Sequence, residues 1–518
     1  MAHSEMNTGE SAPAPWWKTS VGYQIYPRSF CDTTGNGIGD LAGIEVHLDH
    51  VSQLGVDALW ISPFFPSPMA DYGYDVADFC DVDPLFGDLA GFDRLLEAAH
   101  SRGLRVIIDW VPNHSSQRHP WFEESRGSRD DPKRDWYVWR DPAPDGGPPN
   151  NWIESLTFGP AWTLDETTGQ YYLHCFLSEQ PDLNWANPEV VAAMHDTLRF
   201  WLDRGVDGFR MDVVHLIGKD PELPDEPPDF AGLPHTVLNH RPETHALLRD
   251  LRVLLDSYDG DRMAVGEVYL LDTHMVAAHY GAGDELHLCF NFPPLYAPFE
   301  AEAWRRQIAT TAGALDPIGA WPTWVLSNHD NPRHRSRYGG DGRVARAAAV
   351  LLLTVRGTPF LYAGEELGLE DAVVSEKQRH DPAGRDGCRA PIPWTADDHH
   401  GWAGPDPWLP WPPEASSRNA AVLAADDASI LNLYRRLLTL RSSTPTLQRG
   451  ELELHTDSGD VLVFDRRLGA TLIRVVINMS AEPGVVAAPN GSLLISSTAR
   501  TEFDGTLQPY EAVVLDLT

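Results

Sequence analysis

Charged side chains stand where several short apolar segments end, and these residues could do chemistry. The stretch GVDGFRMDVVHLIG (205–218) contains a segment with the pattern of a short buried strand, 208–211, which presents Arg210 and Asp212 side by side. Two converging carboxylates can hydrolyse a glycosidic bond, because one attacks the anomeric carbon while the other protonates the leaving oxygen. The ends of other apolar segments carry comparable residues, namely Asp109, Asn113, His114, Glu267, Asn328, His329 and Asp330.

Each of these residues has a simpler explanation when it is taken alone. An acidic residue after a strand is often the N-cap of the next helix, although capping explains less well why several strands all end in charge. A metal-dependent hydrolase is the rival interpretation of a rim of histidines and aspartates. It needs ligand spacings such as HxH or HExxH, which are absent, so we rank it below glycoside hydrolysis.

Eight apolar segments rich in β-branched residues alternate with helical patterns such as 92–102 and 189–204. This alternation predicts a parallel sheet, and eight units predict a closed (β/α)8 TIM barrel of the α/β class. The carboxyl ends of barrel strands form one rim, where the polar residues would converge. The predicted strands are 21–26, 57–61, 104–110, 207–211, 263–268, 286–291, 323–328 and 358–362.

Two further regions interrupt or follow this pattern. Residues 113–183 are too many for an unstructured loop, so we predict a small inserted domain after the third strand, in which GQYYLHCF is typical of a strand. Alternating segments without helices predict a C-terminal antiparallel β-sandwich domain at 447–518. The catalytic barrel would then comprise 16–112 and 184–446, with Pro-rich loops at 220–234 and 402–417.

The composition favours a soluble enzyme with an uncharged substrate. The 518 residues include 40 Lys and Arg against 75 Asp and Glu, and the formal net charge of −35 disfavours nucleic acid and membrane surfaces as partners. The content of 42% hydrophobic and 10% aromatic residues is that of a globular protein. Some of the 18 Trp fit stacking on sugar rings, although most of them are expected in the core.

Signals for membrane insertion or secretion are not predicted. Residues 1–20 lack a basic region followed by an apolar core, and the longest apolar run, 347–355, is too short to span a bilayer. Five scattered cysteines without a CxxC spacing predict reduced thiols. We therefore expect a cytoplasmic monomer or homodimer.

Four segments closely resemble the signature regions of the α-amylase superfamily, glycoside hydrolase family 13. They are DWVPNH (109–114), GFRMDVVH (208–215), GEVY (266–269) and LSNHD (326–330). The resemblance runs from about residue 16 to the C-terminus. Within the family, the segments DYGYDVADF, GNGIGD, QPDLNW and RDGCRAPIPW are similar to those of exo-acting oligosaccharide glucosidases.

The resemblance implies roles for three carboxylates. Asp212 resembles the nucleophile that forms a β-glucosyl-enzyme, Glu267 the general acid and then base, and Asp330 the carboxylate that holds the sugar 2- and 3-hydroxyls. A retaining pair stands about 5–5.5 Å apart. Arg210 would keep Asp212 ionised by its opposite charge, whereas Glu267 needs a raised pKa to arrive protonated. A structural ion pair is the alternative role of Arg210.

The resemblance also implies a set of contacts to glucose. His114 and His329 resemble donors to its hydroxyls. Asp71 and Arg385 resemble the pair that grips the 4-hydroxyl of a terminal glucose, which closes the pocket at one end and makes an enzyme exo-acting. The chain is one residue shorter than the usual spacing near Phe158. The full set is Asp71, Tyr74 as the stacking aromatic, His114, Phe158, Gln180, Arg210, Val213, His329 and Arg385.

The linkage that is cleaved and the acceptor stay open. In this family a valine after the nucleophile tends to accompany α-1,6 cleavage, yet the insertion 220–234 is not typical of oligo-1,6-glucosidases, and Val213 could equally pack in the βα turn. We favour hydrolysis of maltose and short malto-oligosaccharides. The alternatives are an isomaltase-like oligo-1,6-glucosidase and a glucosyl-transferring enzyme, such as a transglucosidase or trehalose synthase.

A family member without catalysis is a further alternative. Such members serve as transporter partners or binding modules, lack one or more of the three carboxylates and usually carry a transmembrane helix. This chain keeps all three carboxylates and has no such helix, so we rank this alternative last.

The segment DTTGNGIGD (32–40) resembles the family's divalent cation loop. The candidate ligands Asp32, Thr34, Asn36, Ile38 and Asp40 alternate as in an EF-hand. Only two of them are charged, and position 12, where an EF-hand has Glu, is a glycine. A structural Ca²⁺ or Mg²⁺ and a loop without metal both stay open, and we expect no cofactor in catalysis.

Overall fold

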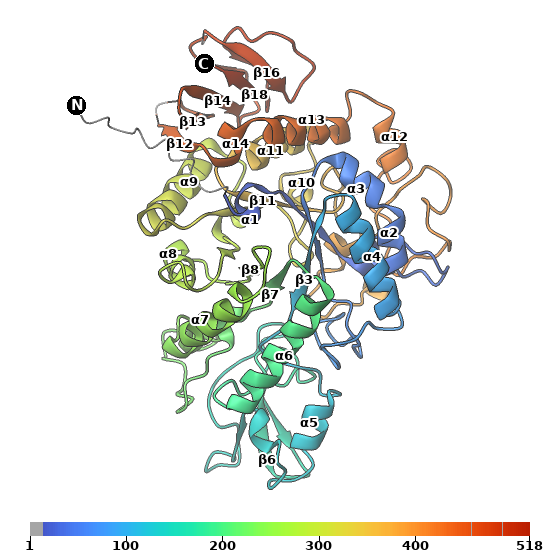
Figure 1. Ribbon diagram of the computed structural model, residues 1–518, viewed down its shortest axis with the longest axis vertical. Coiled ribbons are helices and arrows are strands. Elements are labelled where there is room, and N and C mark those ends of the chain that lie inside the picture. The colour runs from blue at the N-terminus through green and yellow to red at the C-terminus, as the bar shows by residue number, and fades with distance from the viewer. Residues whose placement is uncertain (1–13, 457, 489) are drawn as a thin grey trace, which may run out of the picture.

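A computed structural model describes residues 14–518 except 457 and 489, and it places a smaller unit at each end of a barrel (Figure 1). Residues 1–13, part of the segment in which no signal peptide is predicted, lie outside the described residues. In the described part of the chain, no helix is both long enough and apolar enough to cross a membrane. The five cysteines are free, as predicted.

Eight strands of the described chain form one sheet in the order β10-β11-β1-β2-β3-β7-β8-β9. Neighbouring strands run parallel, and β11 returns to pair with β1. The hydroxyl of Thr323 in β10 donates to the carbonyl of Cys289 in β9 at 2.6 Å, which links the two ends of this order. All eight predicted strands are confirmed, and each lies inside its predicted range. They are β1 (Gly22–Ile25), β2 (Ala58–Ile61), β3 (Arg105–Trp110), β7 (Gly208–Met211), β8 (Met263–Gly266), β9 (Leu288–Cys289), β10 (Thr323–Val325) and β11 (Thr358–Tyr362).

The helices cover the outside of this sheet (Figure 1). In α6 the side chain of Asn187 caps the first turn, Gly205 ends the helix at φ 104°, and apolar residues at helical spacing bury one face. The predicted helices 92–102 and 189–204 correspond to α4 and α6. The bounds are α1 (Trp16–Thr19), α2 (Leu41–Val46), α3 (Leu48–Leu54), α4 (Leu89–Ser101), α6 (Pro188–Arg204), α7 (Pro242–Asp256), α8 (Thr273–Ala277), α9 (Ala301–Leu315), α10 (His334–Arg337), α11 (Gly342–Thr354), α12 (Ala420–Ala424), α13 (Ile430–Ser443) and α14 (Pro445–Arg449).

A small sheet lies between β3 and α6, where the sequence predicts an inserted domain. Its antiparallel strands pair in the order β4-β6-β5, and β6 is the strand predicted from GQYYLHCF. The guanidinium of Arg134 stacks on Trp139 at 3.5 Å from the ring centroid. The elements of this segment are α5 (Pro120–Ser125), β4 (Trp139–Arg140), β5 (Trp162–Asp165) and β6 (Gln170–Leu173).

The C-terminal unit is an antiparallel sheet in the order β12-β13-β14-β18-β16, with a two-stranded sheet of β15 and β17 beside it. The buried Arg466 of β13 donates to the carbonyl of Thr354 at the end of α11 and so ties this sheet to the barrel. The predicted fold class is thereby confirmed. The strands are β12 (Glu451–His455), β13 (Val461–Leu468), β14 (Thr471–Asn478), β15 (Gly484–Val485), β16 (Ser492–Ser496), β17 (Thr506–Leu507) and β18 (Ala512–Asp516).

Candidate active site

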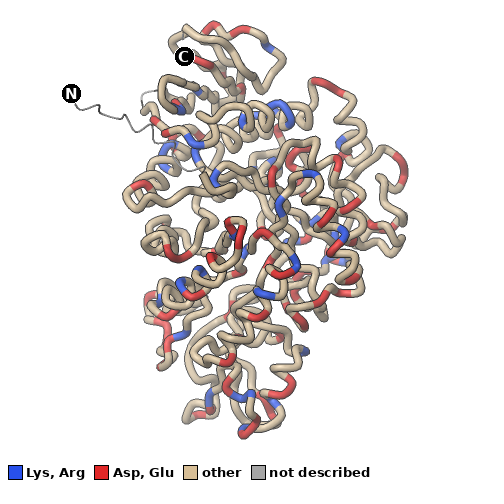
Figure 2. Tube along the Cα trace, in the orientation of Figure 1, with Lys and Arg blue, Asp and Glu red and all other residues tan. Residues whose placement is uncertain are grey.

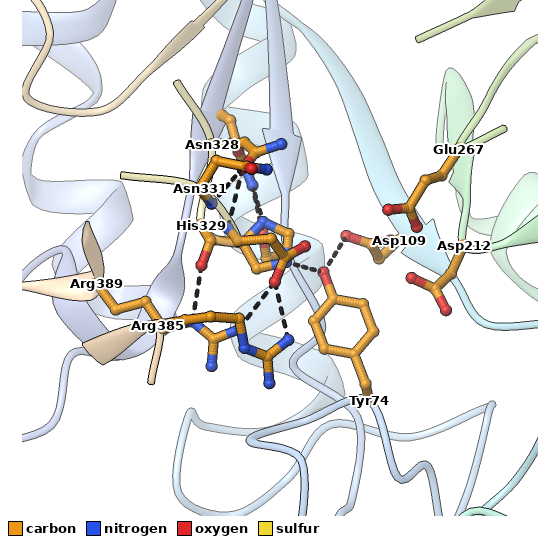
Figure 3. Close-up of polar contacts among 12 residues, drawn as sticks. Tyr74, Asp109, Asp212, Glu267, Asn328, His329, Asn331, Arg385 and Arg389 are labelled. Atoms are coloured by element: carbon orange, nitrogen blue, oxygen red, sulfur yellow. Dashed lines mark hydrogen bonds and ion pairs between the residues drawn. The ribbon is translucent and has the colours of Figure 1, made fainter. Parts of the chain in front are cut away.

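Four buried charged residues meet at the carboxyl ends of β3, β7 and β8. The sheet register pairs Asp109 of β3 with Arg210 of β7, so their side chains lie on the same face. Asp212 directly follows β7, and Glu267 directly follows β8. Figure 3 shows the carboxyl groups of Asp109, Asp212 and Glu267 turned toward one region. The predicted convergence of these strand ends is therefore present.

Arg210 stands at the centre of this cluster. Its Nη1 donates to Asp109 Oδ1 and to Asp212 Oδ1, both at 2.6 Å. Its Nη2 donates to Glu267 Oε2, which also accepts from the backbone N–H of Val213 at 3.1 Å. One guanidinium thus serves three buried carboxylates, and it cannot neutralise them all.

Burial and the shared guanidinium act in opposite directions on the pKa values of Asp109 and Asp212. Burial raises the pKa of Asp212 well above its usual range; Arg210 acts against this rise, and the nearby Glu267 and Asp109 add to it. Burial also raises the pKa of Asp109 to about 6, again against the charge of Arg210. Arg210 lowers the pKa of Asp212 in the expected direction, but its charge is divided over three acids and does not outweigh burial.

Asp330, after β10, lies among positive charges instead. Its Oδ1 accepts from Arg385 Nη1 and from Arg389 Nη2, each at 3.0 Å, and its Oδ2 lies 3.2 Å from His329 Nε2. Burial acts to raise the pKa of Asp330, but His329, Arg385 and Arg389 outweigh it and hold this pKa well below its usual range. Asp330 is therefore ionised at neutral pH.

Arg385 also binds a second acid, Asp71. Its Nη2 donates to Asp71 Oδ1 at 2.6 Å, and the other oxygen of Asp71 accepts from Gln180 Nε2 at 3.1 Å. The Gln180 amide in turn lies 3.0 Å from His114 Nε2. The side chains of Asp71, Gln180 and His114 are buried, whereas those of Asp330 and Arg385 are half-buried. The predicted pair of Asp71 and Arg385 is thus formed, and we call Asp71, Gln180, Asp330 and Arg385 the closed end of the site.

Tyr74 and His329 join the two groups of acids. Their rings stack with centroids 5.3 Å apart and planes 8° apart, and the tyrosine hydroxyl bridges His329 Nε2 and Asp109 Oδ2. Burial lowers the pKa of His329 to about 3 and that of His114 to about 4. Both predicted hydroxyl-binding histidines are therefore neutral at pH 7, and each carries one N–H donor.

A cavity of about 430 Å³ opens outward from this point. Glu267, Asp330 and Arg385 lie along its wall, together with residues of the inserted segment such as Phe158 and residues of the 234–239 loop. Phe158 is 62% exposed, so it borders this outer cavity and is not part of the closed end with Gln180. We call the apolar boundary formed by Phe158, Phe176, Val213 and Tyr269 the open end of the site.

Val213 has a strained backbone. Its φ of 34° and ψ of 37° are left-handed, a region that β-branched residues avoid at a cost of about 1–3 kcal/mol. The strain turns its N–H toward Glu267, while its side chain packs with Leu216, Leu223 and Leu238 under the loop that follows β7. The predicted packing role of Val213 is present, together with a position on the cavity wall.

Sequence reasoning missed two cations in this region. Arg389 contacts Asp330 and follows Arg385 by four residues in the quoted segment RDGCRAPIPW, so the spacing was available as a signal. Lys219 donates to Asn113 Oδ1 at 2.6 Å and pairs with Asp182 at 2.9 Å. No motif marks Lys219, and the pairing depends on the course of the loop after β7.

The 32–40 loop closes on itself. The Asp32 carboxylate accepts from the backbone N–H groups of Thr34, Gly35 and Gly37. The Asp40 carboxylate accepts from the backbone N–H groups of Thr33 and Gly43. The amide oxygen of Asn36 accepts from the N–H of Ile38. No cluster of three or more His, Cys, Asp or Glu suited to a metal exists in the described residues. These residues fit a self-bonded turn better than a metal cage, and the metal stays a prediction.

Comparison with known proteins agrees with this geometry. Residues 24–450 match the family described as the alpha amylase catalytic domain. The chain is 44% identical to a probable alpha-glucosidase of Rhizobium meliloti, over 92% of this chain and 91% of that protein. It is 37% identical to an oligo-1,6-glucosidase of Heyndrickxia coagulans, over 96% and 99% of the two chains.

Solved structures share the whole architecture. An alpha-glucosyl transfer enzyme superposes with a TM-score of 0.91 at 41% identity, covering 98% of this chain and all (100%) of that chain. The trehalulose synthase MutB from Pseudomonas mesoacidophila superposes with a TM-score of 0.91 at 34% identity, with the same coverage. The similar structures thus include proteins that are named for glucosyl transfer or synthesis.

Proposed function

Because the chain belongs to the alpha-amylase family, glycoside hydrolase family 13, we propose that it is a retaining exo-acting α-glucosidase. It would release α-glucose from the non-reducing end of maltose and short malto-oligosaccharides. The observation that carries this proposal is the ion pair of Asp71 and Arg385, which lies beside the carboxylates and would let only a terminal sugar ring enter. The coarser conclusion, a glycoside hydrolase, rests on the family itself.

The roles proposed for the acids follow from a two-step mechanism. A carboxylate oxygen of Asp212 bonds to the anomeric carbon, the bond from this carbon to the leaving oxygen breaks, and Glu267 gives its proton to that oxygen. Glu267 then takes a proton from water, whose oxygen displaces Asp212 and releases α-glucose. This mechanism requires an ionised Asp212 and a protonated Glu267 when substrate is bound.

The closed end would hold the glucose ring. Asp330, kept ionised by Arg385 and Arg389, can accept hydrogen bonds from sugar hydroxyls, and the neutral His114 and His329 can donate to others. The Tyr74 ring would stack against one face of the glucose ring. These contacts need no metal, and we propose that catalysis requires no cofactor; dialysis against EDTA should leave the rate of maltose hydrolysis unchanged.

Glucosyl transfer is the second candidate, and the open end favours it. Apolar groups such as Phe158 and Tyr269 would retain a sugar acceptor and shield the glucosyl-enzyme from water. The alpha-glucosyl transfer enzyme and the trehalulose synthase among the similar structures point the same way. An oligo-1,6-glucosidase is the third candidate, supported by Val213 and by relatives that carry this name.

Proton NMR of the purified enzyme with maltose and, separately, with isomaltose tests the proposal. Faster release of α-glucose from maltose is expected, and faster release from isomaltose would support the oligo-1,6-glucosidase instead. New glucosides that exceed free glucose at low sugar concentration would support transfer. β-Glucose as the first product would overturn the retaining mechanism and the role of Asp212.

A further inference from the structure

A second cavity lies away from the candidate active site, where barrel helices meet the C-terminal sheet. Its volume is about 750 Å³, and residues of α11, α13, β16 and the turn before β18 line it. None of the residues assigned above to glucose binding or hydrolysis lines it. We call it the junction cavity.

The charge of the junction cavity is opposite to that of the chain. The chain has 75 acidic and 40 basic residues, and Figure 2 shows basic segments gathered along α13 near this junction. Asp427 is the only acidic residue among those that line the cavity. The arginines that line it are Arg343, Arg346, Arg436 and Arg500. Such a reversal in an acidic protein marks a place where a negative charge would be stabilised.

Two of these arginines have no acidic partner. Arg346 donates to the carbonyls of Ser497 at 2.6 Å and Ala428 at 3.0 Å, and Arg436 donates to the carbonyl of Asp427 at 2.9 Å. In the described part of the chain, no salt bridge neutralises either guanidinium. The two guanidinium groups are neighbours, because they donate to the carbonyls of the adjacent residues Ala428 and Asp427. Burial lowers the pKa of Arg346 and the charge of Arg436 lowers it further, while the nearby Asp426 acts in the opposite direction.

Other polar groups on the cavity wall already have partners. The hydroxyls of Ser496 and Thr498 donate to the buried carboxylate of Glu511, which also pairs with Arg500 at 2.8 Å. Arg343 pairs with Asp341 at 2.7 Å. Among the arginines that line the cavity, Arg346 and Arg436 are therefore the two left to meet an anion.

We propose that the junction cavity binds a small phosphorylated metabolite, with its phosphate group between Arg346 and Arg436. Arginine forks match the oxygens of a phosphate in pairs, and a dianion would cancel the repulsion between the two guanidinium groups. The cavity is larger than one phosphate ion, so an organic part fits beside it. Tyr510, with Arg343 placed 5.4 Å from its ring centroid, provides a flat surface for that part.

Calorimetric titration of the full chain with inorganic phosphate, ribose 5-phosphate and ribose tests this proposal. Both phosphates should bind at one site, and ribose should not. Tighter binding of ribose 5-phosphate identifies an organic phosphate as the occupant. Equal binding of the two phosphates would assign the site to free phosphate and overturn the organic part of the proposal. Absence of binding by both at millimolar concentration would overturn the site itself.

Variants locate the binding. Arg436→Gln removes an exposed guanidinium bonded only to a backbone carbonyl, so the fold should persist, and affinity for ribose 5-phosphate should fall at least about tenfold. Arg346→Lys keeps the charge but loses the fork, and should weaken affinity less. Arg306→Gln, 67% exposed on α9, is the matched control and should bind as the parent does. Unchanged affinity in Arg436→Gln would place the phosphate elsewhere.

Discussion

At the closed end of the site, Arg385 joins Asp71 and Asp330, and every contact is a buried or half-buried ion pair or hydrogen bond. At the open end, Phe158 and Tyr269 expose their aromatic rings to solvent and carry no charge. Ion pairs fix distance and direction, so the closed end can recognise one sugar ring. Apolar contacts are not directional, so the open end can accept different leaving groups or acceptors. Recognition of the terminal sugar ring and tolerance of the group attached to it would thus depend on different parts of the site.

The largest effect should come from the acids. Asp212→Asn should lower kcat for maltose by about 10⁴-fold or more, because an amide cannot form the glycosyl ester. Phe158→Ala at the open end should cost less than about tenfold in kcat/KM. Initial rates for both variants, with circular dichroism to verify folding, test the contrast. Similar losses in the two variants would erase the distinction between the catalytic acids and the open end.

Arg385→Gln should have the next largest effect. It leaves Asp71 and Asp330 without their shared cation, and kcat/KM for maltose should fall about 10²- to 10³-fold. Arg385 helps to hold the pKa of Asp330 low, so its removal raises this pKa and moves the acidic limb of the pH–rate profile to higher pH. Arg385→Lys should restore the position of that limb in part. A limb that stays in place would show that Asp330 does not need this cation.

Val213→Ala should change selectivity more than rate. The smaller side chain widens the open end, and the ratio of kcat/KM for maltose over isomaltose should rise about three- to tenfold. The rate on maltose should stay within about threefold of the parent. A constant ratio would leave Val213 as a packing residue and move the specificity to the 220–234 loop.

Glu365→Gln should leave the rate of hydrolysis unchanged, and it tests whether burial keeps this carboxyl group protonated in the folded chain. Glu365 is buried, with His334 Nδ1 3.9 Å from its Oε1, and burial raises its pKa to about 8 against the opposing effects of Tyr362, Ser327 and Arg333. The unfolded chain ionises this group at its ordinary pKa near 4.5, so the parent should lose stability as pH rises from about 4.5 to 8.

The glutamine variant lacks this loss, so its stability relative to the parent should grow by about 2–4 kcal/mol between pH 5 and pH 8. Urea unfolding at the two pH values measures the difference. A constant difference would mean that Glu365 is ionised within the fold, so that burial does not keep this acid protonated.

The sequence allowed the barrel to be predicted strand by strand, because strands buried on both faces are nearly continuous apolar runs, as in 104–110. It also allowed the acids to be predicted, since they stand at strand ends. The division of Arg210 among three carboxylates could not be predicted, because it depends on distances between β3, β7 and β8. The left-handed backbone of Val213 and the pairing of Lys219 with Asp182 likewise arise only when distant loops are packed together.

The pairing of β1 with β11 means that the barrel cannot close until nearly the whole barrel sequence has been synthesised. Residues 22–25 leave the ribosome early and pair with β2, but their other edge waits until residues 358–362 have been made. An edge strand exposed for that long is open to pairing with other chains. The contact is also very distant in sequence, which slows folding. Any fragment that ends before residue 358 should therefore aggregate, whereas slower synthesis at low temperature should raise the yield of the complete chain.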